Sequence, residues 1–196
     1  PMINRINQLL NEPGSAVAFY YKDKPVTQKE FASCVKTYAA QAADIPGKKV
    51  VLYSDDTFCF FVGFFALMAA GKELILPTYY NDNLPEELDC PDIFTDKAHN
   101  GTVIIDYEGV STDESCDVPL LLSAETCIYF YTSGSTGTPK KIGKRFQNML
   151  DETVWLSELL EGALEKDPVF LATVNVNHMY GIFYHFLVPY SNGAVI

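Results

Sequence analysis

The sequence has 196 residues, and its content of 48% hydrophobic and 13% aromatic residues is typical of a globular protein. This composition excludes an intrinsically disordered chain, which would be too poor in apolar residues to form a core. The 25 acidic residues outnumber the 14 basic residues and give a formal net charge of −11. Nucleic acid is therefore not expected as the main partner, because polyphosphate backbones are bound by clustered basic side chains.

The cysteines and the apolar runs both favour a cytoplasmic protein. None of the five cysteines lies two or three residues from another, so we expect free thiols rather than a zinc knuckle, a redox pair or a disulfide framework. The longest apolar run, residues 58–71, is shorter than the roughly 20 residues that span a bilayer. It predicts a buried helix, and we expect no transmembrane segment.

The first clear helix start lies at Thr27. A threonine followed three residues later by Glu30 is the capping-box pattern, in which each side chain bonds the free backbone N–H of the other residue. The apolar residues that follow recur at helical spacing, and 46–47 (Pro-Gly) ends the pattern. This face is formed by Phe31, Cys34, Val35, Tyr38, Ala39 and Ala42.

A strand–helix–strand unit comes next. Residues 50–53 and 74–76 are short apolar runs that predict buried strands. Between them, Asp56 is placed to cap a helix over 57–70, and Gly71 can supply the left-handed residue that ends it. Because this helix is apolar all round, we expect it to be covered on both sides.

The second half of the chain is less regular. Short strands are predicted at 93–95 and 102–106, an acidic connector at 111–117, and a buried strand at 124–131. A long amphipathic helix is predicted over 146–164.

The last part of the chain predicts three more elements. These are a strand over 169–174, a helical segment over 180–188 and the opening of a strand at 193–196. A strand that opens at the last residue indicates a truncated chain.

One loop carries the chemistry. Residues 132–140 read Thr132, Ser133, Gly134, Ser135, Thr136, Gly137, Thr138, Pro139 and Lys140. The two glycines let backbone N–H groups converge on an anion, the hydroxyls add donors, and the lysine adds a positive charge. This pattern predicts a polyphosphate cradle, with a flexible Gly/Ser linker as the alternative. It is not a Walker A loop, because Pro139 and Lys141 replace the glycine and the Ser/Thr that this motif requires.

The stretch 129–140 resembles the signature loop of the adenylate-forming enzymes, which include acyl-CoA synthetases, peptide-synthetase adenylation domains and luciferases. Segments 26–31, 47–50 and 64–72 also resemble that family, and 177–181 resembles its His-x-Tyr-Gly motif.

The resemblance implies a layered α/β fold with a largely parallel sheet and flanking helices, as in the N-terminal region of these synthetases. It implies a first subdomain over 2–122 and the start of a second over 123–196, truncated at its C-terminal end. The parent enzyme would use ATP and Mg²⁺ to activate a carboxylic acid, fatty or aryl, as an acyl adenylate. Thr132 would lie near the Mg²⁺, the loop and Lys140 would hold the phosphates, and His178 would be catalytic.

Departures from the family pattern leave the thiol acceptor open. The family usually has a glycine and then a histidine between the loop and the following helix, where this chain has 141–146. This variant is more similar to ligases found beside fatty-acid and aryl-polyene assembly genes, so CoA and the phosphopantetheine of an acyl carrier protein both stay open.

The alternatives are less specific. His178 could be a structural histidine that caps a helix, and neither His99 nor His185 is assigned a function. An aromatic cluster at 58–65 is interpreted as core rather than as an acyl tunnel. For the whole chain, the alternative to an enzyme is a non-catalytic nucleotide- or phosphate-binding module. We expect the fragment to fold, to be inactive alone, and to self-associate through an apolar edge near 195–196.

Overall fold

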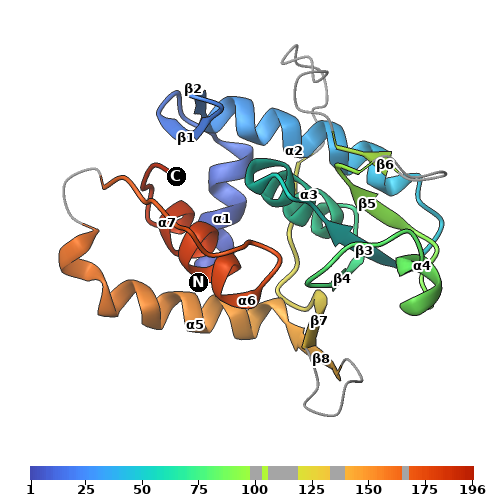
Figure 1. Ribbon diagram of the computed structural model, residues 1–196. Coiled ribbons are helices and arrows are strands. Elements are labelled where there is room, and N and C mark those ends of the chain that lie inside the picture. The colour runs from blue at the N-terminus through green and yellow to red at the C-terminus, as the bar shows by residue number, and fades with distance from the viewer. Residues whose placement is uncertain (98–102, 106–118, 133–139, 165–167) are drawn as a thin grey trace.

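The computed structural model describes residues 1–97, 103–105, 119–132, 140–164 and 168–196 (Figure 1). The strands are β1 (Val17–Tyr21), β2 (Lys24–Thr27), β3 (Lys49–Tyr53), β4 (Glu73–Leu76), β5 (Ile93–Thr95), β6 (Val103–Ile104), β7 (Cys127–Thr132) and β8 (Lys140–Arg145). The helices are α1 (Met2–Asn11), α2 (Gln28–Ala43), α3 (Thr57–Ala69), α4 (Leu84–Glu87), α5 (Phe146–Leu159), α6 (Met179–Gly181) and α7 (Val188–Ser191). A 3₁₀ turn η1 (Glu161–Ala163) and a π-helical segment η2 (Ile182–Leu187) complete the set.

A six-stranded sheet is the framework of the described residues. Its strand order is β6-β5-β3-β4-β7-β8, and every neighbouring pair is parallel except β7 and β8, which form an antiparallel hairpin. The strands β1 and β2 form a separate antiparallel pair. The largely parallel sheet with flanking helices is confirmed, while the division into subdomains at 122/123 stays a prediction.

The two faces of the sheet are covered unequally. Alternate residues of β3, such as Leu52, join the main hydrophobic core on the α3 side, whereas Val51 belongs to a small second cluster. In the described part of the chain, the only helix in that second cluster is the short α4, through Leu84, and Leu88 joins the cluster directly after this helix. Gly63 lets α3 approach the first face closely, because a Cβ there would lie 2.7 Å from Leu52 Cδ1.

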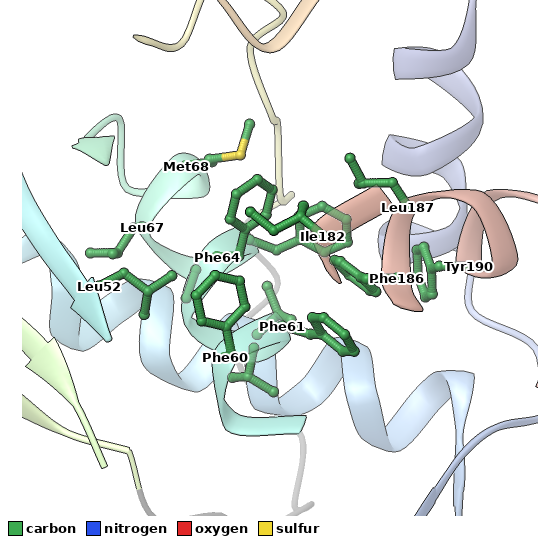
Figure 2. Packing of buried hydrophobic residues seen from close by; sticks show 14 of the residues in the cluster. Leu52, Phe60, Phe61, Phe64, Leu67, Met68, Ile182, Phe186, Leu187 and Tyr190 are labelled. Atoms are coloured by element: carbon green, nitrogen blue, oxygen red, sulfur yellow. The ribbon is translucent and has the colours of Figure 1, made fainter. Parts of the chain in front are cut away.

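Helix α3 is buried on every side. Asp56 caps it by accepting a hydrogen bond from the Cys59 amide, and Gly71 follows its end with a positive φ of 73°, both as predicted. The sheet covers one side, and η2 and α7 cover another, where the rings of Phe61 and Phe186 stack at 4.0 Å (Figure 2). The aromatic cluster is therefore core, as expected.

The membrane and cysteine predictions can be compared directly with the fold. Within the described ranges, no helix combines the length and the apolar character that a bilayer crossing requires. Four cysteines are free thiols, and Cys116 lies outside the described residues. Burial raises the pKa of the Cys34 thiol to about 12, as expected for a thiol that serves as core rather than as a nucleophile.

One predicted strand is wrong. Residues 169–174 do not form a strand, and only Val169 makes an isolated bridge, to Val195. The side chains of Val169, Leu171 and Val174 are exposed, with Leu171 at 94%, so the β-branched composition of this segment does not reflect burial in a sheet.

The hairpin strand β8 was not predicted. Its sequence Lys-Lys-Ile-Gly-Lys-Arg carries four basic residues and no alternating apolar pattern. The antiparallel pairing with β7, in register from Cys127↔Arg145 to Thr132↔Lys140, nevertheless places it at the sheet edge.

The remaining expectations have mixed outcomes. The helix predicted over 146–164 ends at Leu159 and continues as η1, and the helical segment over 180–188 is confirmed. The connector 111–117 lies outside the described residues. Near the last residues, the backbone of Ile196 is paired with β1, through Ala18 O and Tyr20 N, so the free edge expected at 195–196 is not seen.

The capping box of α2 provides a test of the fold. Thr27 Oγ1 accepts from the Glu30 amide at 3.2 Å, and the Thr27 amide donates to Glu30 Oε2 at 2.7 Å. We expect Thr27→Ala to lower the free energy of unfolding, measured by urea denaturation, by about 1 kcal/mol.

Thr37→Ala is the matched control, because Thr37 lies inside the same helix and its hydroxyl only bonds the Ser33 carbonyl. Alanine is a better helix former there, so its effect should be near zero. Equal losses in the two variants would contradict the capping role.

Candidate functional site

The carboxyl ends of the parallel strands meet at one edge of the sheet. The strands β3, β4 and β7 end there at Tyr53, Leu76 and Thr132. In open α/β sheets, ligands bind at this edge. Thr132 is the last residue of β7 and pairs with Lys140, the first residue of β8. The hairpin therefore holds the two ends of the predicted cradle side by side.

The structure describes the two ends of the predicted cradle, Thr132 and Lys140. The central residues of the cradle lie outside the described residues, namely Ser133, Gly134, Ser135, Thr136, Gly137 and Thr138. Their assignment to phosphate binding stays a prediction, as does the metal role of Thr132. Lys140 is exposed at the mouth of the hairpin.

A cavity of about 340 Å³ lies at this edge, between the β7–β8 hairpin and the segment before η2. It is lined by Thr78, Phe130, Tyr131, Ile142, Lys144, Asn177, His178, Met179 and Tyr180. Apolar walls with a few polar groups are typical of small-molecule sites, which begin at about 300 Å³. The structure thus brings His178 to the same hairpin that carries Thr132 and Lys140.

The histidine segment is tied to β3 by a buried amide. Asn177 is 1% exposed, and its Nδ2 donates to Ser54 O at 2.8 Å while the Ser54 amide donates to Asn177 Oδ1 at 3.4 Å. Ser54 directly follows β3 at the carboxyl edge. This two-point pairing fixes the segment against the sheet, and its loss would leave buried polar groups unsatisfied.

A tight turn then presents His178 to the cavity. The His178 amide donates to Asn175 O at 3.1 Å, and its carbonyl accepts from the Ile182 amide as the helical segment begins. Gly181 packs against this turn so closely that a Cβ would overlap the Asn175 carbonyl oxygen and lie 2.7 Å from the carbonyl carbon. The glycine that follows Tyr180 is therefore required by a close backbone approach.

The second described histidine belongs to a different environment. His185 lies in the π-helical segment η2, where its ring meets Phe61 edge-on at 5.7 Å. Burial lowers the pKa of His185 below its ordinary value, which favours the neutral ring. It does not line the cavity that contains His178. His99 lies outside the described residues.

Acidic side chains near this edge bond to other groups of the protein. Asp96 accepts from the backbone amides of Asp55 and Asp56, and Asp55 forms an ion pair with Lys97. The hydrogen bond from Lys97 lowers the pKa of Asp55. Among the residues that the structure describes, no group of three or more His, Cys, Asp or Glu side chains could hold a metal ion.

This chain is similar to known proteins in both sequence and fold. A family model described as AMP-binding enzyme matches residues 78–196. Acetyl-coenzyme A synthetase of Bacillus subtilis is 29% identical over 100 residues, which is 50% of this chain and 17% of that protein.

Two solved structures share the fold. One is o-succinylbenzoate coenzyme A synthetase (MenE) of Bacillus subtilis in complex with ATP and magnesium ion, with a TM-score of 0.72, 17% identity, and coverage of 100% of this chain and 56% of that chain. The other is ATP-bound MatB of Rhodopseudomonas palustris, with a TM-score of 0.75, 17% identity, and coverage of 99% and 44%. The chain therefore spans about half the length of these solved relatives.

The close approach at Gly181 can be tested. Gly181→Ala should displace the turn at 175–181, lower the free energy of unfolding by about 1–3 kcal/mol and speed amide hydrogen exchange in that turn. Gly162→Ala is the control, because a Cβ at that glycine meets nothing within 4 Å. Unchanged exchange in Gly181→Ala would show that the turn is not held as described.

Proposed function

The chain belongs to the AMP-binding enzyme family, and on that premise we propose that the whole protein is an acid–thiol ligase that forms AMP. A carboxylate oxygen of the acid attacks the α-phosphorus of ATP, pyrophosphate leaves, and an acyl adenylate forms. A thiol then attacks the acyl carbon, and AMP leaves with the former carboxylate oxygen.

The observation that carries this proposal is the cavity between His178 and the β7–β8 hairpin. His178, held by the buried Asn177–Ser54 pairing, faces the hairpin whose ends are Thr132 and Lys140. We propose that the loop amides and hydroxyls, together with Lys140, bind the β- and γ-phosphates. We propose that His178 lines the place where the carboxylate meets the α-phosphate. Positive charge and aligned donors there would stabilise the charge that develops on pyrophosphate.

The described residues fit a magnesium ion held mainly by substrate. Mg²⁺ prefers oxygen ligands and usually keeps few protein ligands beside phosphates and water. From the resemblance of the loop to the family's signature, we propose that the Thr132 hydroxyl is a protein ligand of that ion. The ion would neutralise charge on the phosphates.

The substrate acid and the thiol are also proposals. A cavity of about 340 Å³ with Phe130, Ile142 and Met179 in its walls suits a fatty or aryl acid. The acceptor is CoA or the phosphopantetheine of a carrier protein. Residues 1–196 alone should give no reaction, because they span about half of the solved relatives.

We expect the whole protein to exchange labelled pyrophosphate into ATP when given Mg²⁺ and a suitable carboxylic acid. Removal of Mg²⁺ should abolish the exchange. Lys140→Ala should lower kcat/KM for ATP by roughly 10- to 100-fold, because one charge-assisted contact to phosphate is lost.

Lys141→Ala is the matched control. Lys141 is adjacent in sequence, but its ammonium lies over the Tyr129 ring at 4.4 Å, on the other face of the hairpin. The Lys141→Ala substitution should leave kcat/KM for ATP within about threefold of the value for the unsubstituted protein. Absence of exchange with every aliphatic and aromatic acid would reject the ligase proposal and favour a non-catalytic phosphate-binding module.

A further inference from the structure

Positive charge is concentrated on β8 in a chain whose net charge is −11. The basic side chains divide between two environments. Lys141 lies over Tyr129 on the face of the second cluster, and Arg145 forms an ion pair with Glu125 at 3.1 Å. Lys144 instead lines the cavity that contains His178.

Among the residues that the structure describes, the ion-pair partner of Lys144 is Glu152, and the contact is a weak one. The Lys144 ammonium lies 3.8 Å from Glu152 Oε2 on α5, beyond the 2.7–2.9 Å or so of a charge-assisted hydrogen bond. Both side chains are partly exposed, at 31% and 39%, and such pairs contribute little to stability. The walls of the same cavity include Phe130 and Ile142, whose side chains cannot solvate a cation. An anion in the cavity would therefore interact favourably with Lys144.

The position of Lys144 separates it from the phosphate end of the site. Lys144 pairs with Ile128, whereas Lys140 pairs with Thr132 at the carboxyl edge. At about 3.4 Å per residue, the two lysine backbones are about 14 Å apart along the strand. Phosphates bound at the mouth of the hairpin would therefore contact Lys140. An anion bound by Lys144 would belong to a second ligand, at the end of that ligand that lies away from the phosphates.

We propose that the acid activated at this site is a dicarboxylic acid whose distal carboxylate is bound by Lys144. This inference rests on the proposed function, since it assigns the substrate class of the same cavity. One carboxylate reacts near His178, the hydrocarbon middle packs against Phe130, Ile142 and Met179, and the second carboxylate meets the ammonium. A monocarboxylic acid of the same length would leave Lys144 facing an apolar group, which disfavours its binding.

The test uses pyrophosphate exchange by the whole protein with acids paired by length, hexanoic with hexanedioic and octanoic with octanedioic. We expect kcat/KM to favour the diacid of each pair by at least roughly tenfold. Lys144→Met should lower kcat/KM for the diacids by roughly 10- to 100-fold while leaving the monoacids within about threefold, so that the preference disappears. Lys144→Arg should retain most of the preference, because the guanidinium also binds carboxylate.

Lys141→Met is the control, because it removes the same charge from the same strand on the opposite face. It should keep the diacid preference. Equal use of diacids and monoacids by the original protein would overturn the proposal. So would a Lys144→Met variant that raises the KM for ATP and affects both acids equally, because the lysine would then bind phosphate.

A direct binding measurement separates this proposal from the ligase proposal. Calorimetry with residues 1–196 should show heat of binding for octanedioate that is absent with octanoate and with Lys144→Met. If no acid supports exchange but this difference is seen, the ligase proposal fails and the anion site stands. If exchange occurs but Lys144→Met binds octanedioate as the original chain does, the anion site is wrong.

Discussion

The structure depends on one constraint, which is that α3 has no polar face. Every residue of α3 from Phe58 to Met68 is buried, so the helix must be enclosed by other elements. Burial of each large apolar side chain contributes about 1.5–3 kcal/mol relative to exposure. The sheet encloses one side, and α2 packs along another. The C-terminal helices close the remaining side, where Phe186 stacks on Phe61 (Figure 2).

This enclosure also places the candidate site. Because η2 and α7 must cover α3, the residues just before η2 are brought to the carboxyl edge of the sheet. Asn177 then locks that segment to Ser54, and the turn closed by Gly181 turns His178 toward the hairpin. The packing of the hydrophobic core thus determines which residues lie at the polar edge of the sheet.

Sequence patterns predicted those elements that are determined by residues close together in the chain. The capping box at Thr27, the apolar helix and its Asp56 cap are contained within a few residues and are all confirmed. The strand β8 was missed because its basic composition does not indicate that it pairs with β7. The strand predicted over 169–174 was wrong because apolar residues in that segment remain exposed.

The site was predictable only in part. The loop and His178 stood out through their resemblance to a family, and the cavity places His178 against the hairpin that carries the two described ends of that loop. The Asn177–Ser54 pairing joins residues 123 positions apart, so no local pattern could reveal it. The role of Gly181 and the direction of Lys144 likewise follow from packing between distant segments.

We propose that a carboxylate attacks the α-phosphorus of ATP at this edge of the sheet. The most direct measurement supplies the whole protein with ATP, Mg²⁺ and an acid whose carboxylate carries ¹⁸O, and traps the acyl group with hydroxylamine. Attack by the carboxylate forms a carbon–¹⁸O–phosphorus bridge, and trapping breaks the carbon–oxygen bond. We expect AMP that carries one ¹⁸O atom. Unlabelled AMP, or ¹⁸O recovered in inorganic phosphate, would contradict this proposal.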